Sequence, residues 1–91
     1  MKKAVRLSII GSMQGIFYRQ FIKKIAEEQG IKGFLRFKDG GLVEIFIEGE
    51  TGAVDAAVVA CKQGPRHSQI RSIEEKSERL QDFSEFKVYG F

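Results

Sequence analysis

The sequence predicts an α+β fold in which two helices cover one face of a mixed, mainly antiparallel sheet. Three observations lead to this prediction. Apolar residues alternate with a period of two in residues 4–10, 31–38 and 42–48, as they do in half-buried strands. Residues 18–29 instead have the period of an amphipathic helix, and so do the residues that follow Gly52. Strand, helix, strand, strand, helix and strand thus follow one another, and this order favours helices packed against a sheet.

The first strand and the first helix each have a clear apolar side. One face of a strand over residues 4–10 consists of Val5, Leu7 and Ile9. The apolar stripe of a helix from Tyr18 to about Gln29 consists of Tyr18, Phe21, Ile22, Ile25 and Ala26. Gly30 is typical of the C-terminal end of a helix. We therefore predict a strand, a connecting loop and an amphipathic helix in this part of the chain.

Residues 31–38 and 42–48 are predicted to form an antiparallel hairpin. The segment Asp39-Gly40-Gly41 between them is a turn signal. On the second strand, one face consists of Val43, Ile45 and Ile47, and the other of Glu44, Phe46 and Glu48. On the first strand, Gly33, Leu35 and Phe37 share a face, and aromatic side chains pack well on strands.

The C-terminal half predicts a second helix followed by two strands. The apolar stripe of the helix consists of Val54, Ala57, Val58 and Cys61, and the helix is expected to end at Gly64-Pro65. Ile70 and Ile73 anchor a fourth strand, residues 74–82 are predicted to be an exposed connection, and residues 83–91 contain a short fifth strand. This order is the ferredoxin-like βαββαβ arrangement with an added C-terminal strand, and we expect residues 1–91 to form one domain.

The composition is that of an ordinary globular protein, with 43% hydrophobic and 30% charged residues and a net charge of +3. Cys61 is the single cysteine, so no intramolecular disulfide forms, and we expect it to act as a small buried hydrophobe. His67 is the single histidine and is expected on a surface loop, so neither a metal site nor another cofactor is expected. The sequence has neither an apolar leader nor a membrane-length apolar run, and we expect a cytoplasmic monomer.

The segment from Gly11 to Arg19 is the candidate functional site. It joins a strand to a helix N-terminus, where backbone N–H groups lack intrahelical partners and the helix dipole favours an anion. Gly15 accommodates a tight turn, and the Arg19 guanidinium matches a phosphate in shape and charge. An ordinary strand-to-helix connection is the alternative interpretation, but a cation in a first helical turn is unfavourable without a nearby anion.

This segment resembles the signature loop of the acylphosphatase family, written G-x-V-Q-G-V-x-F-R. The residues identical to the signature are Gly11, Gln14, Gly15 and Arg19. The signature positions filled by similar apolar or aromatic side chains are Met13, Ile16 and Tyr18. Residues 33–43 are similar to the second family signature, in which a glycine, an aromatic and a basic residue precede an asparagine. In this chain Phe37 stands where the family has that catalytic asparagine.

The resemblance implies hydrolysis of an acyl phosphate to a carboxylate and phosphate. The backbone of residues 14–19 would bind the phosphoryl group together with the Arg19 guanidinium; these residues are Gln14, Gly15, Ile16, Phe17, Tyr18 and Arg19. The family's asparagine holds the attacking water, and Phe37 has no polar group for this task. A carboxylate is a good leaving group, so the reaction needs no metal. We therefore expect an impaired hydrolase that binds acyl phosphate, phosphate or sulfate.

Two other functions remain open from the sequence. An acylphosphatase-like domain without the asparagine is also suited to binding anions for recognition rather than catalysis. An RNA-binding module shares the βαββαβ order, and Phe34, Phe37 and Phe46 would be its aromatic surface. The RNA interpretation is weaker, because the aromatic signature falls on the second strand instead of the third. The interleaved Lys, Arg, Asp and Glu residues also give no concentrated basic patch.

Overall fold

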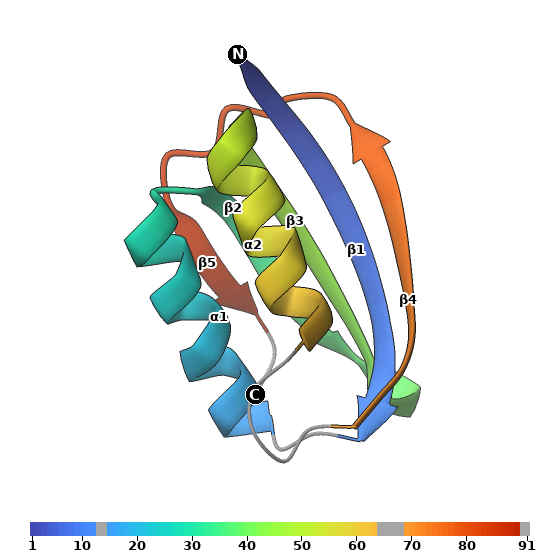
Figure 1. Cartoon of the computed structure of the whole chain (residues 1–91). Coiled ribbons are helices and arrows are strands. Elements are labelled where there is room, and N and C mark those ends of the chain that lie inside the picture. The colour runs from blue at the N-terminus through green and yellow to red at the C-terminus, as the bar shows by residue number, and fades with distance from the viewer. Residues whose placement is uncertain (13–14, 64–68, 90–91) are drawn as a thin grey trace.

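The computed structural model describes residues 1–12, 15–63 and 69–89, without the side chains of residues 12, 15–18, 39 and 69. Its strands are β1 (Lys2–Ser12), β2 (Lys32–Lys38), β3 (Leu42–Glu50), β4 (Gln69–Glu78) and β5 (Phe86–Tyr89). The helices are α1 (Gly15–Gln29) and α2 (Thr51–Gln63), and a 3-10 turn (Asp39–Gly41) joins β2 to β3. Both long helices lie on the same face of the sheet (Figure 1). The predicted ferredoxin-like α+β fold is confirmed.

The strands form one mixed sheet in the order β4-β1-β3-β2-β5. Neighbouring strands are antiparallel except for β2 and β5, which run parallel with Leu35 opposite Val88. The predicted hairpin of β2 and β3 is present, and it pairs Phe37 with Val43. The register of β1 against β4 shifts between Ile10 and Gly11, just before the loop that leads to α1.

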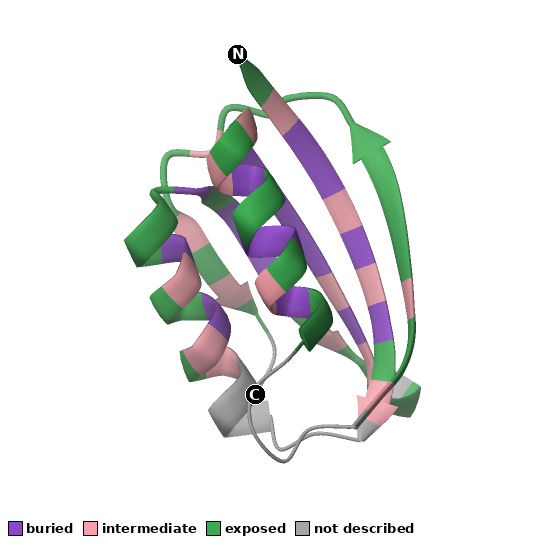
Figure 2. Cartoon of the chain, in the orientation of Figure 1, coloured by how far each residue is buried: buried purple, intermediate pink, exposed green. Residues whose placement is uncertain are grey.

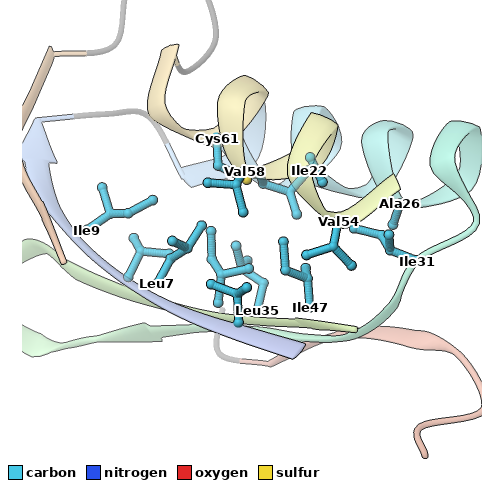
Figure 3. Packing of buried hydrophobic residues seen from close by; sticks show 14 residues of the cluster. Leu7, Ile9, Ile22, Ala26, Ile31, Leu35, Ile47, Val54, Val58 and Cys61 are labelled. Atoms are coloured by element: carbon cyan, nitrogen blue, oxygen red, sulfur yellow. The ribbon is translucent and has the colours of Figure 1, made fainter. Parts of the chain in front are cut away.

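The main hydrophobic core fills the space between the helices and the sheet (Figure 3). Its members include the alternating residues predicted for the strands, such as Leu7, Leu35 and Ile45, each with no exposed surface. The predicted stripe of α2 is also buried; it consists of Val54, Ala57, Val58 and Cys61. Figure 2 shows the buried positions of both helices on the sides that meet the sheet, while the outer sides are exposed. The periodicity in the sequence therefore identified the core correctly.

The opposite face of the sheet carries a second, smaller cluster. It contains Ala4, Phe34 and Phe46, with Phe83 packed against them. Phe46 was predicted on the polar face of its strand, and it does lie there, but it is fully buried. The connection between β4 and β5 supplies Phe83 and covers part of this face. The face without helices is therefore only partly exposed to solvent.

A buried carboxylate holds this connection in place. Glu48 is only 3% exposed, and its oxygens accept hydrogen bonds from the backbone N–H groups of Gln81 (2.8 Å), Asp82 (3.2 Å) and Phe83 (2.8 Å). Asp82 has a φ of 58°, which turns the chain so that its neighbours' N–H groups converge on Glu48. Three donors satisfy a charged group that would otherwise be costly to bury.

The prediction for residues 74–82 was partly wrong, because β4 continues to Glu78. The prediction relied on apolar alternation, which this segment lacks. As an edge strand, β4 pairs with β1 on one side and is exposed along most of its length, so polar residues suffice there (Figure 2). Glu75 also forms an ion pair with Lys62 on α2 at 3.0 Å. Predictions for Gly64, Pro65 and His67 lie outside the described residues.

Candidate phosphate-binding site

Arg19 lies in the second turn of α1, which begins only four residues earlier at Gly15. Its side chain is half-buried, and its Nε atom is shielded from solvent. The guanidinium carbon lies 5.8 Å from the centre of the Phe37 ring. The structure therefore brings the predicted phosphate-binding arginine together with Phe37, the residue predicted to stand at the family's asparagine position.

Phe37 reaches this place from β2, next to the turn into β3. It is half-buried and packs against the main core, on the same face as Leu35. These contacts show that Phe37 packs on the core, as expected for an aromatic residue on this face of the strand; its lack of a chemical role stays a prediction. The same geometry also shows that the side chain at position 37 borders the Arg19 guanidinium.

The rest of the predicted cradle is described only in part. Gln14 lies outside the described residues, and residues 15–18 are described as backbone in the first turn of α1. In any α-helix the first four N–H groups have no intrahelical acceptor, and in this helix they lie close to Arg19 along the chain. An anion held by these N–H groups would also meet the positive end of the helix dipole.

Among the described side chains next to Phe37, that of Lys38 does not take the place of the predicted asparagine. The Lys38 Nζ lies 3.3 Å from a Glu44 carboxylate oxygen on the opposite face of the sheet, as expected for the residue that follows Phe37 on a strand. The side chain of Asp39 is not described. Among the described side chains near position 37, the contact that faces Arg19 is therefore an aromatic ring.

The opposite face of the sheet holds a network of charges around Glu44. Its carboxylate lies 3.2 Å from Arg6 Nη1, 3.3 Å from Lys38 Nζ and 3.9 Å from Arg36 Nη1. Burial raises the pKa of Glu44, but Lys38 and the two arginines lower it by more, so the net pKa lies below the usual 4.5. Glu44 is thus held ionised at neutral pH as the centre of a structural network.

The aromatic rings do not form the surface that an RNA-binding module requires. Phe34 is 8% exposed, Phe46 is fully buried, and Phe37 lies on the other face of the sheet. Arg36 and Arg6 cover Phe34, with guanidinium carbons 5.3 Å and 5.9 Å from its ring centre. Bases stack on exposed ring faces. This geometry does not support the RNA alternative.

Other candidate groups in the described part of the chain offer little chemistry. Cys61 is 1% exposed, and burial raises the pKa of its thiol to about 12, so it is not a nucleophile at neutral pH. Among residues 1–12, 15–63 and 69–89, no three His, Cys, Asp or Glu side chains are grouped as a metal site. No helix in these ranges is long and apolar enough to span a membrane.

Glu48 was predicted only as one of the residues on the second face of its strand, yet this residue holds the segment beside the second cluster. Its three hydrogen-bond partners lie 33 to 35 positions further along the chain. A local pattern carries no information about contacts at such separations. The available signal was an acidic residue near the end of a mostly apolar strand.

The fold and the site define a small α+β sandwich with a half-buried arginine in the second turn of its first helix. A family model described as acylphosphatase matches residues 5–88. The chain belongs to the acylphosphatase family, whose members act on small acyl phosphates. The resemblance inferred from the two signatures is thereby confirmed.

Relatives support this assignment across the chain. The chain is 40% identical over 76 residues to an acylphosphatase of Rubrobacter xylanophilus, with 84% of this chain and 69% of the relative covered. It is 32% identical to an acylphosphatase of Archaeoglobus fulgidus, with 93% and 96% covered. The crystal structure of Bacillus subtilis acylphosphatase superimposes with a TM-score of 0.88 at 28% identity, covering 99% of this chain and all of that one.

A larger protein contains the same fold. Full-length HypF, in a phosphate- and nucleotide-bound form, matches 99% of this chain with a TM-score of 0.88 and 28% identity. The match covers 12% of the HypF chain. The acylphosphatase fold therefore occurs both in proteins of this size and as a part of a longer chain.

Proposed function

We propose that this protein binds the phosphoryl group of small acyl phosphates and hydrolyses them slowly. Arg19 and the backbone N–H groups of residues 14–19 hold the phosphoryl group. Water attacks phosphorus, the bond from phosphorus to the carboxylate oxygen breaks, and the products are a carboxylate and inorganic phosphate. The observation that carries the proposal is the contact between the Arg19 guanidinium and the Phe37 ring.

Binding of the phosphoryl group draws on three features of the loop. A guanidinium donates hydrogen bonds in a planar fork that fits phosphate oxygens. The N–H groups at the start of α1 add further donors and a favourable dipole. Charge that develops on phosphoryl oxygens in the transition state meets the same donors, so they also assist the reaction.

The leaving group explains why so few residues suffice. A carboxylic acid has a pKa of about 4, so the carboxylate departs without protonation. Neither a metal nor a general acid is required for this step. The remaining task is to place the water in line with the leaving group, which depends on a polar side chain near the phosphoryl group.

Phe37 is the reason for proposing slow turnover. A phenyl ring neither donates nor accepts a conventional hydrogen bond, so it does not orient water. Misplacement of a reacting group by a small distance typically costs on the order of 10²-fold in rate. Compared with a site that has asparagine at this position, the site would therefore still bind the phosphoryl group but hydrolyse the acyl phosphate much more slowly.

A non-catalytic anion-binding domain is the second candidate, and the same aromatic residue favours it. Complete loss of water orientation would leave a site that recognises phosphate or sulfate without turnover. We also propose that residues 1–91 act as a single cytoplasmic domain and a monomer, with a small-molecule ligand and no nucleic acid. The family match over most of the chain supports the single domain and its small-molecule ligand, and the burial of Phe34 and Phe46 argues against nucleic acid.

The test compares Arg19→Ala with Arg36→Ala. Arg36 is a matched control because it is an arginine over an aromatic ring on the opposite face of the sheet. Acetyl phosphate hydrolysis and inorganic phosphate binding are measured for both variants and the wild type. We expect Arg19→Ala alone to weaken phosphate binding, by roughly 10- to 100-fold for a charge-assisted contact. Binding without turnover would favour the recognition domain, and equal effects of the two substitutions would contradict both functions.

A further inference from the structure

The ring of Phe37 has a second consequence for the site besides the loss of a water-orienting group. We propose that Phe37 is a positioning residue for the Arg19 guanidinium, so that it strengthens phosphate binding while it slows hydrolysis. This inference rests on the proposed function, because it requires Arg19 to bind the phosphoryl group. The new element is that the aromatic ring contributes to anion binding by holding the Arg19 guanidinium in place.

The two residues meet in a cation–π contact between two different elements. Arg19 belongs to α1 and Phe37 to β2, and the guanidinium carbon lies 5.8 Å from the ring centre. This separation is within the range of about 6 Å at which a cation is attracted to a ring face. Because Arg19 Nε is shielded from solvent, the attraction is weakened less by water than at an exposed site.

The ring is a fixed platform, whereas an arginine side chain is intrinsically mobile. Phe37 packs against the main core, and its backbone is paired with Val43 in the sheet. A free arginine loses side-chain entropy when it binds an anion. A guanidinium already held by the ring has lost part of that entropy beforehand, so the entropic cost of ordering it when the anion binds is smaller.

The ring and the phosphate use different parts of the guanidinium. A guanidinium that stacks on an aromatic ring meets it with its planar face. The N–H donors of a guanidinium lie in the plane of the group, where an anion would meet them at its edge. Asparagine at position 37 would offer an amide for hydrogen bonding with water but no aromatic face. Replacing one by the other therefore exchanges water orientation for arginine positioning.

This exchange predicts effects of opposite sign on rate and affinity. Tighter binding of substrate and transition state alike lowers KM without raising kcat. Phe37→Asn would supply an amide that orients water and remove the ring that holds Arg19. This variant should therefore raise kcat for acetyl phosphate and weaken the binding of inorganic phosphate. A residue with a purely structural role would, when replaced, damage both properties or neither.

Four further variants separate the aromatic ring from its bulk. Phe37→Tyr keeps the ring, while Phe37→Leu and Phe37→Met keep an apolar side chain without it. The matched control is Tyr89→Leu, because the Arg36 guanidinium carbon also lies 5.8 Å from the Tyr89 ring centre, on the opposite face of the sheet. Inorganic phosphate is titrated calorimetrically into each variant, and thermal unfolding confirms that each is folded.

We expect Phe37→Leu and Phe37→Met to weaken phosphate binding by roughly 2- to 5-fold, and Phe37→Tyr to stay within about 2-fold of the wild type. Tyr89→Leu should bind like the wild type. Wild-type affinity in a folded Leu or Met variant, or an equal loss in Tyr89→Leu, would overturn the inference while leaving the proposed function intact. A wild-type protein that binds no phosphate would overturn the proposed function and this inference with it.

A measurement on the wild type keeps the test independent of how the variants fold. Protons held over the face of an aromatic ring resonate upfield of their usual positions in NMR spectra. The δ and ε protons of Arg19 should therefore be shifted upfield, and should remain so when inorganic phosphate is added. Unshifted Arg19 resonances in the phosphate-bound protein would overturn the positioning role.

Discussion

Gly33 on β2 lies directly against the backbone carbonyl of Phe46 on β3. A Cβ atom at position 33 would overlap the carbonyl oxygen and stand 2.8 Å from the carbonyl carbon. The φ angle of Gly33 is +137°, in a region that other residues rarely adopt. The glycine that opens the second family signature therefore serves the pairing of β2 with β3, and through it the placement of Phe37.

Gly33→Ala should destabilise the protein by roughly 1–3 kcal/mol, because the methyl group meets a backbone that cannot move independently of the sheet. Chemical denaturation measures this change in the free energy of unfolding. Gly52→Ala is the matched control, since Gly52 lies in α2 with open space around it and no positive φ. We expect that control to be stabilising by about 0.5–1 kcal/mol. Equal effects at the two positions would contradict the steric explanation.

Phe37→Asn should accelerate acetyl phosphate hydrolysis by on the order of 10²-fold, because the amide can orient a water that the ring cannot. Steady-state release of inorganic phosphate measures the rate. Phe37→Leu is the control, since it removes the ring without supplying a polar group, and we expect its kcat to stay low. If the wild type already hydrolyses acetyl phosphate as fast as Phe37→Asn, the water-holding role has been assigned to the wrong position.

Glu48→Gln should destabilise the protein by about 1–3 kcal/mol. The amide nitrogen of glutamine cannot accept a hydrogen bond, so at least one of the three N–H groups that converge on this side chain loses its acceptor. Amide hydrogen exchange at residues 81–83 should become faster, as the connection over the second cluster opens more often.

The control for this variant is Glu50→Gln. Glu50 is two residues further along β3, and its side chain is 67% exposed. We expect little change in stability or in exchange at residues 81–83 for this substitution. Unchanged exchange in Glu48→Gln would show that other contacts hold the connection.

The pH dependence of stability should contain a contribution from Glu44. Its pKa in the folded protein is lowered from 4.5, so its stabilising contribution is complete above that value and is lost as the pH falls through the lower, folded-state pKa. Glu44→Gln should therefore lose less stability than the wild type between pH 7 and about pH 3. Urea denaturation at the two pH values measures the difference.

Glu28→Gln is the comparison for this experiment. Glu28 is 58% exposed and pairs with Lys24 at 3.9 Å, so its removal should change the acid sensitivity little. Identical acid sensitivity of the wild type and Glu44→Gln would refute the contribution assigned to the charge network.

The sequence by itself determined the elements and the core. Alternating apolar residues in β1 and β3 and helical spacing in α1 and α2 depend on local geometry, so they can be recognised within a dozen residues. Gly30, with φ of 68°, ends α1 as predicted, for the same local reason. The two signatures also identified the family, because they combine local residue types with a consistent spacing.

Only the tertiary structure decided which groups meet across those elements. The extension of β4 to Glu78 depends on its pairing with β1, and the burial of Glu48 depends on N–H groups more than 30 residues away. The contact between Arg19 and Phe37 likewise joins residues of two different elements, α1 and β2. The spacing of residues in the sequence indicates which side chains share a face of one element. The distances between side chains of different elements depend instead on how the whole core packs.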